Sequence, residues 1–106
     1  MKPEIFLPFP EHEEILISNL GNVYKKVVKE RNKPIVFKQL SVYNTDNKFN
    51  QHSYFYVYKD GKAHKYSLAR AVAKLFLNTP KNVTKVIHLN LDNFDNRAEN
   101  LKWKIK

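Results

Sequence analysis

Residues 54–66 read YFYVYKDGKAHKY and have the clearest local pattern in the chain. Aromatic and β-branched residues flank Asp60-Gly61, which indicates two β-strands joined by a two-residue turn. With this turn as the loop, four cross-strand pairs are predicted: Tyr58 with Ala63, Val57 with His64, Tyr56 with Lys65, and Phe55 with Tyr66. Side chains alternate along a strand, so the hairpin has two faces. One face holds Phe55, Val57, His64 and Tyr66, and the other holds Tyr54, Tyr56, Tyr58 and Lys65.

A helix is predicted at about residues 67–78, directly after this hairpin. Ser67 is a good N-cap, and Thr79-Pro80 marks the end. The apolar residues of this segment form one stripe at i, i+4, i+7 and i+8: Leu68, Val72, Leu75 and Phe76. That stripe needs an apolar sheet face to cover, and the nearest is the face with Phe55 and Val57. The tyrosine face then either stays outward or is buried under the N-terminal hairpin, and both arrangements remain open.

Residues 1–50 predict an N-terminal β module. Residues 3–14 are rich in Pro and Glu and lack a period, so we expect an extended lead-in. Residues 15–17 and 23–24 are β-prone and bracket turn-forming residues, which predicts a short hairpin. A basic run follows, and then residues 35–37 and 40–43 predict one or two more strands. Residues 44–51 are polar and aperiodic, and they predict a loop.

Residues 80–106 predict a second hairpin at the C-terminus. Residues 86–89 are β-prone, residues 90–96 are dense in Asx-turn formers, and residues 101–105 alternate apolar side chains with lysine. The whole pattern predicts an α+β fold in a single domain over residues 1–106, in which residues 51–79 form the hairpin plus helix.

The composition narrows the possible functions. The chain contains no cysteine, which excludes disulfides, zinc fingers and other thiolate metal sites. It shows no signal peptide or membrane span, so we expect a cytoplasmic protein without a membrane partner. The net charge is +9, and residues 1–20 contain one lysine against four glutamates, so the remainder is strongly basic. A positive body of this kind attracts nucleic acid, although a basic surface also serves solubility alone.

Three segments resemble one family. Residues 17–23, ISNLGNV, resemble the VSNLGRV signature of a short module that precedes the nuclease motif in phage HNH homing endonucleases. Residues 54–77 resemble the hairpin plus helix before that motif, through YKDGK at 58–62 and RAVAKLF at 70–76. Residues 86–103 resemble VNHIDGNKTNNRVENLEW, the first two-thirds of the HNH motif.

The resemblance implies a ββα-metal nuclease fold, of which residues 80–106 would form the ββ part. His88 then stands at the position of the catalytic general base, and Asn100 stands at the middle Asn that braces the loop and orients the histidine. In the family, one divalent ion such as Mg²⁺ stabilises the charge that develops on the phosphate.

The chain also departs from the family pattern. Ile87 stands where relatives often have a carboxylate or amide metal ligand, and Asn90-Leu91 replaces their Asp-Gly. Ala69 replaces a frequent histidine, and we expect the final ligand-bearing helix to be missing after Lys106. We therefore expect no metal ligands and no cofactor, except Mg²⁺ if the nuclease site works.

These departures affect the histidines. We expect His88 to be a hydrogen-bonded strand residue without catalytic duty. His12, His52 and His64 have no ligand-like spacing and are expected to be ordinary loop or surface residues.

The leading hypothesis is a double-stranded-DNA-binding protein of phage origin that lacks efficient cleavage. The expected DNA contacts are Lys25, Lys26, Lys29, Lys59, Lys62, Lys65 and Arg70 on phosphates, with Tyr56 as a groove reader. Two alternatives remain open. One is an active, metal-dependent nicking endonuclease, and the other is a protein that binds a host or virion protein.

Overall fold

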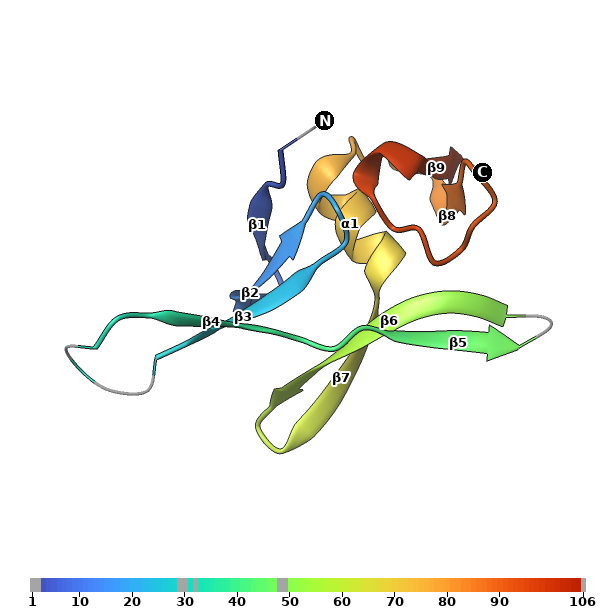
Figure 1. The fold of residues 1–106 in the computed structure, drawn as a ribbon. Coiled ribbons are helices and arrows are strands. Elements are labelled where there is room, and N and C mark those ends of the chain that lie inside the picture. The colour runs from blue at the N-terminus through green and yellow to red at the C-terminus, as the bar shows by residue number, and fades with distance from the viewer. Residues whose placement is uncertain (1–2, 29–30, 32, 48–49, 106) are drawn as a thin grey trace.

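A computed structural model describes residues 3–28, 31, 33–47 and 50–105, with the backbone alone for residues 46, 47, 50 and 84. The described residues form three antiparallel sheets and one α-helix, which confirms the α+β class (Figure 1). The first sheet contains β1 (Phe6–Phe9), β2 (His12–Ser18), β3 (Val23–Val27) and β4 (Val36–Gln39), in that order. The second contains β5 (Tyr43–Asn47), β6 (Asn50–Lys59) and β7 (Lys62–Ser67). The third contains β8 (Val83–His88) and β9 (Leu101–Ile105), and α1 (Leu68–Phe76) and the 3₁₀ turn η1 (Ala98–Asn100) complete the fold.

The predicted hairpin at residues 54–66 is confirmed in its register. Strands β6 and β7 pair as expected: Phe55 with Tyr66, Tyr56 with Lys65, Val57 with His64, and Tyr58 with Ala63. Asp60 and Gly61 both have positive φ, 55° and 75°, which a two-residue turn of type I′ requires. The local chemistry of the Asp-Gly pair therefore sets which side chains share a face.

The predicted helix is also confirmed, slightly shorter than expected. The Ser67 side chain accepts a hydrogen bond from the Arg70 N–H at 3.3 Å and so caps α1. The helix ends at Phe76, because Leu77 already has extended backbone. Leu68 and Val72 are buried, so the apolar stripe covers the sheet as predicted.

One hydrophobic core surrounds α1 and draws side chains from all three sheets. Phe9 and Ile17 come from the first sheet, Phe55 from the second and Trp103 from the third, and all are buried together with Val72 of the helix. The helix is the common support, so the position of each sheet depends on its contact with α1.

The expected lead-in at residues 3–14 is wrong, because most of this segment lies in β1 and β2. Phe9 anchors it: its ring centroid lies 4.9 Å from that of Tyr66 and 5.9 Å from that of Phe55. His12 was expected at the surface but is 6% exposed, and its Nε2 shares a hydrogen bond with the Tyr66 hydroxyl at 2.7 Å. The strand structure of this segment depends on packing against Tyr66. That contact is tertiary, so the local sequence gives no sign of it.

The expected loop at residues 44–51 is also wrong, because β5 pairs with β6 there. Asn44 lies opposite Ser53, and the Ser53 hydroxyl donates to the Asn44 side-chain oxygen at 2.7 Å. β5 is an edge strand of the second sheet. An edge strand is held by its backbone ladder and tolerates polar side chains, so it lacks the apolar alternation of a half-buried strand.

In the part of the chain that the structure describes, no helix is long and apolar enough to cross a membrane.

Candidate nucleic-acid interface and histidine site

His88 is the last residue of β8 and pairs with Leu101, the first residue of β9. The Leu89 N–H donates to the Asn100 carbonyl at 2.8 Å and closes the hairpin just beyond His88. Leu101 and Trp103 are buried against the core, so β9 anchors the hairpin. The half-buried His88 ring is therefore held on a supported strand end rather than on a free loop.

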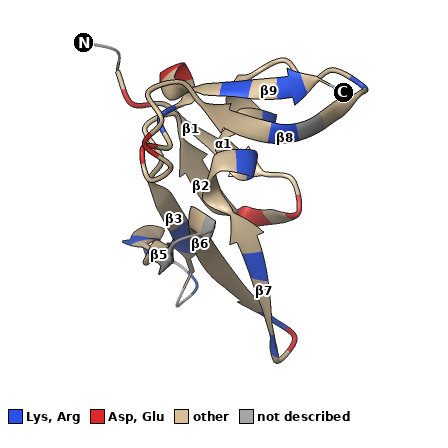
Figure 2. Cartoon of the chain, turned by 90° about the vertical axis from the view of Figure 1, so that its right-hand side faces the viewer, with Lys and Arg blue, Asp and Glu red and all other residues tan. Residues whose placement is uncertain are grey.

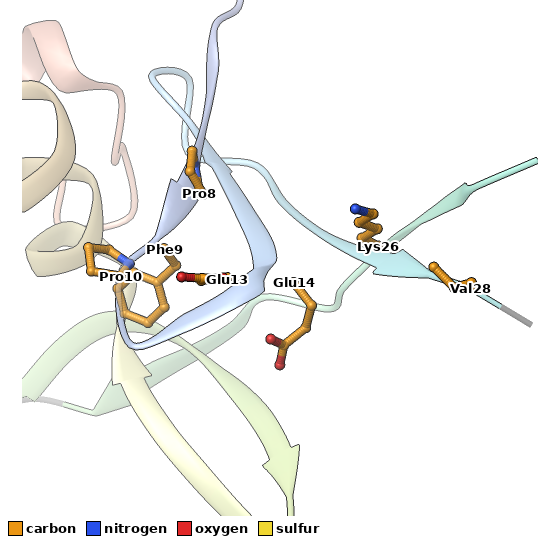
Figure 3. A pocket seen from close by; sticks show the side chains of 7 residues that line it. All are labelled: Pro8, Phe9, Pro10, Glu13, Glu14, Lys26 and Val28. Atoms are coloured by element: carbon orange, nitrogen blue, oxygen red, sulfur yellow. The ribbon is translucent and has the colours of Figure 1, made fainter.

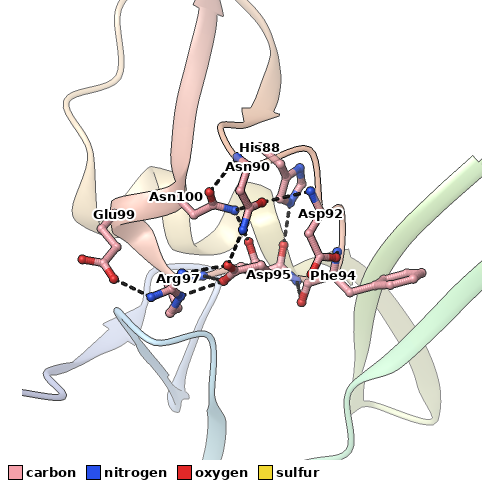
Figure 4. A network of polar contacts seen from close by, with 9 residues as sticks. His88, Asn90, Asp92, Phe94, Asp95, Arg97, Glu99 and Asn100 are labelled. Carbon is pink, nitrogen blue, oxygen red and sulfur yellow. Dashed lines mark hydrogen bonds and ion pairs between the residues drawn. The ribbon is translucent and has the colours of Figure 1, made fainter.

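Asn100 connects the two ends of the loop after His88 (Figure 4). Its side chain is 5% exposed and makes three hydrogen bonds. The oxygen accepts from the Asn90 N–H at 3.0 Å, and the amide donates to the Asn90 side-chain oxygen and to the Asp95 carbonyl, both at 2.9 Å. These bonds hold the two ends of the loop together, as a bracing residue would. That Asn100 also orients His88, which the family resemblance implies, stays a prediction.

Asn96 is the residue that contacts the His88 ring. Its Oδ1 lies 2.9 Å from His88 Nε2, and its side chain is 5% exposed. An amide oxygen only accepts, so in this contact Nε2 is the donor. Sequence reasoning missed Asn96, since its only signal was membership of a loop dense in Asn and Asp.

Two of the resembling segments lie against each other at this loop. The Ala98 N–H donates to the Asn19 carbonyl at 2.7 Å. Gly21 has φ of 87°, and a Cβ there would lie 3.2 Å from the Asn96 carbonyl oxygen. The SNLG segment therefore supports the loop that holds the partner of His88.

Asp95 is fully engaged within the same loop. Its carboxylate accepts from the Arg97 guanidinium through both oxygens at 2.8 Å, and Asn90 donates to it at 2.9 Å. The hydrogen bonds from Arg97 lower the pKa of Asp95 to about 2, against the opposing effect of burial. Arg97 also contacts Glu99 at 2.6 Å, so this cluster is a structural clamp.

The donors around His88 do not fit a hard cation in this arrangement. Mg²⁺ binds through oxygens, usually carboxylates. Ile87 offers none, and Asp95 is held by Arg97, while one Asp92 oxygen accepts from the Phe94 N–H at 3.0 Å. Across the described ranges, no three His, Asp or Glu side chains gather in a group that could hold a metal ion.

A groove of about 540 Å³ opens beside His88, between β8, the start of α1 and the beginning of β6. It is lined by two histidines and two cations: His52, His88, Arg70 and Lys85. Ala69 also lines it. Arg70 was predicted as a phosphate contact and lies in this groove, whereas Lys85 was not predicted. Cations beside an open groove suit a phosphate backbone.

The lysines of the sheets face one another across strands. Lys25 lies opposite Lys38 in the first sheet, and Lys59 lies opposite Lys62 in the second. In the third sheet Lys85 lies opposite Lys104. Directly opposed like charges destabilise a sheet, so the Lys25–Lys38 and Lys59–Lys62 pairs each have an electrostatic cost that a polyanion would relieve. Figure 2 shows Lys and Arg on β7, β8 and β9.

The structure does not gather all the predicted contacts in one place. Lys25 and Lys26 lie on β3, away from the His88 groove, and Lys65 lies on β7 with its ammonium 4.2 Å from the Tyr54 ring centroid. Lys29 lies outside the described residues. The predicted cations are therefore distributed over separate parts of the described structure.

The tyrosine face of β6 and β7 is not covered by the N-terminal hairpin, which packs on the opposite face through Phe9. Tyr43 of β5 lies beside it instead, with its ring stacked on Tyr54 at 5.7 Å. Burial among these rings raises the pKa of Tyr56, with further upward effects from Tyr54 and Tyr58. Tyr56 therefore remains a neutral phenol, half-buried between its neighbours.

A second hollow, of about 790 Å³, lies under the β1–β2 turn (Figure 3). Glu13 and Glu14 line it together with Lys26. Two carboxylates repel phosphate, so this hollow is a poor site for nucleic acid despite its volume.

Comparison with known proteins finds similarity to HNH endonucleases. No family model matches the chain. An uncharacterized HNH endonuclease of Acanthamoeba polyphaga mimivirus is 34% identical over 109 residues, which cover 96% of this chain and 24% of that protein. The solved HNH homing endonuclease I-HmuI, studied for DNA binding and cleavage, has a TM-score of 0.72 at 22% identity. This match covers 95% of the present chain and 52% of that chain.

The resemblance to HNH endonucleases predicted from three segments is therefore confirmed, over nearly the whole chain. The fold of the matched region is similar to that of I-HmuI. The chain spans about a quarter of its curated relative and about half of the solved chain.

Proposed function

We propose that residues 1–106 act as one double-stranded-DNA-binding domain on an HNH endonuclease scaffold. The observation that carries the proposal is the set of opposed lysines, above all Lys25 with Lys38 and Lys59 with Lys62. Within the described part of the chain, no acidic side chain pairs with these four lysines. Phosphates placed between them would turn a repulsive arrangement into an attractive one and release counterions from the DNA.

The binding surface extends along the second sheet. Arg70 lies at the groove beside His88, while Lys59 and Lys62 lie at the far end of β6 and β7. From His52 to Lys59 the strand rises about 3.3 Å per residue, or roughly 23 Å in all. That length corresponds to about seven base pairs of duplex. Lys65 and Tyr56 lie between the two ends along the strands, on the other face of the hairpin from Lys59 and Lys62. Lys25 would extend the contact onto the first sheet, whereas Lys26 lines the hollow with Glu13 and Glu14.

We propose further that this chain by itself cleaves DNA inefficiently. The apolar Ile87 and the clamped Asp95 support this proposal, because both reduce the oxygen donors beside His88. His88 as a base and Asn100 as its brace are the residues on which any remaining activity would depend. We also propose that the protein is of phage origin and acts in the cytoplasm of the host cell.

The test is binding of a fluorescein-labelled duplex, followed by anisotropy between low and moderate salt. We expect affinity to fall steeply with salt, and the double variant K59Q/K62Q to reduce the slope of log K against log salt by about 2. Lys74→Gln is the matched control, because Lys74 is paired with Glu11 at 3.5 Å and lies on the helix. An affinity that does not change with salt, or equal effects of both variants, would overturn the proposal.

An active nicking endonuclease is the second candidate. It is favoured by the position of His88, whose ring lines an open groove together with Arg70 and Lys85. A plasmid-nicking assay with Mg²⁺ or Mn²⁺ decides between the candidates when wild type and His88→Ala are compared. Nicking that disappears in the variant would establish the enzyme.

A further inference from the structure

Tyr58 is the most exposed ring of the tyrosine face. It is 69% exposed and stands at the end of a continuous series in which each ring contacts the next. Its centroid lies 6.4 Å from that of Tyr56, with 34° between the ring planes. Its cross-strand neighbour is Ala63, whose small side chain leaves the space beside the ring open. A flat aromatic surface is thus available next to Tyr56.

A shallow cavity of about 200 Å³ adjoins this ring, between β4, β5 and β6. Tyr43, Tyr56 and Tyr58 line one side of it. The other side is formed by Lys38, Gln39, Leu40 and Ser41, which offer a cation and neutral hydrogen-bonding groups. Lys65 lies on the same face of β6 and β7, where its ammonium is 4.2 Å from the Tyr54 ring centroid. Aromatic faces and cations therefore occur together.

We propose that Tyr58, Tyr56 and Lys38 form a binding site for an unpaired nucleobase of single-stranded DNA. The base would stack on the Tyr58 ring, and a flanking phosphate would lie near Lys38. This inference rests on the proposed DNA-binding function and adds that one part of the surface binds single-stranded DNA. The positive charge of Lys38, opposed by Lys25, complements the DNA backbone that the base belongs to.

The geometry favours an unpaired base over a duplex. In a duplex the faces of the bases are stacked on one another, and a protein reaches only their edges and the backbone. An exposed tyrosine face is used fully only when a base leaves the stack. Single-stranded segments arise whenever a duplex is opened or nicked, so such a site would hold a strand on part of the surface proposed to bind the duplex.

The experiment compares a labelled oligo-dT ten-mer with a blunt duplex, using Tyr58→Leu and the matched control Tyr58→Phe. We expect Tyr58→Leu to weaken single-strand binding about 5- to 20-fold, because one stacked base is lost. Duplex binding should change less than about twofold, and Tyr58→Phe should retain both affinities, since the ring remains. Because Tyr58 is exposed, both variants should fold as the wild type does, and circular dichroism checks this.

The outcomes separate the two proposals. Wild-type protein that binds the duplex but not the ten-mer would overturn this inference and leave the proposed function standing. Equal losses for both ligands in Tyr58→Leu would also overturn it, because the residue would then contact the duplex backbone. Protein that binds neither ligand in dilute buffer would overturn both proposals.

Discussion

Gly21 lies so close to Asn96 that a Cβ at position 21 would approach the Asn96 carbonyl oxygen to 3.2 Å. Gly21 belongs to the SNLG segment near the N-terminus, and Asn96 is the hydrogen-bond partner of His88. The contact therefore joins the N-terminal module to the loop that positions the histidine. It explains why these two segments, distant in sequence, occur together in this fold.

The first prediction concerns this contact. Gly21→Ala should destabilise the protein by about 1–3 kcal/mol, because the residue has φ of 87° and the new methyl group meets backbone. Gly61→Ala is the matched control, since its φ is 75° but nothing lies within 4 Å of the added Cβ. Thermal melting of both variants measures the difference. A larger loss for Gly61→Ala would contradict the importance of the contact.

The second prediction concerns Asn100. Asn100→Ala should cost about 2–4 kcal/mol of unfolding free energy, because it leaves the Asn90 N–H and the Asp95 carbonyl without this buried partner. Urea denaturation measures the loss, and the exposed Asn78→Ala should change the free energy by less than about 0.5 kcal/mol. Equal effects of the two substitutions would show that Asn100 does not brace the loop.

The third prediction is a dependence of stability on pH. The folded pKa of Asp95 is about 2, below its ordinary value of 3.8, so its stabilising effect is fully present above about pH 4. That stabilisation should be lost as the pH falls from about 4 towards 2, when the Asp95 carboxylate is protonated and its ion pair with Arg97 is lost. Melting temperatures of wild type and Asp95→Asn, measured from pH 2 to 6, should converge at the acid end. Curves that stay parallel throughout would refute this assignment.

The fourth prediction concerns the N-terminal strand. Phe9→Ala should destabilise the protein by about 3–5 kcal/mol, because the ring is 2% exposed and packs on Phe55 and Tyr66. Phe6→Ala is the control, since Phe6 is 37% exposed, and it should cost much less. Hydrogen exchange in β1 and β2 should accelerate in the first variant. Unchanged exchange there would mean that the hairpin is anchored elsewhere.

The DNA-binding interpretation depends on residues that sequence alone located only in part. Lys59, Lys62, Lys65 and Arg70 could be proposed because they stand on a hairpin and helix with a strong local pattern. Lys38 and Lys85 were not proposed, since their significance comes from the strand opposite or from the groove beside them. Distance along the chain gives no sign of either relationship.

Local chemistry along the chain was enough to determine the β6–β7 hairpin, its register and the helix that follows, because Asp60-Gly61 and Ser67 act on their immediate neighbours. The sequence also revealed the resemblance to HNH endonucleases, because that resemblance rests on short motifs in a fixed order along the chain. Tertiary structure alone decided that residues 6–18 form β1 and β2, that His12 is buried on Tyr66, and that Asn96 holds His88. These features depend on contacts between residues far apart in sequence, whose energy exists only once the chain has folded around α1.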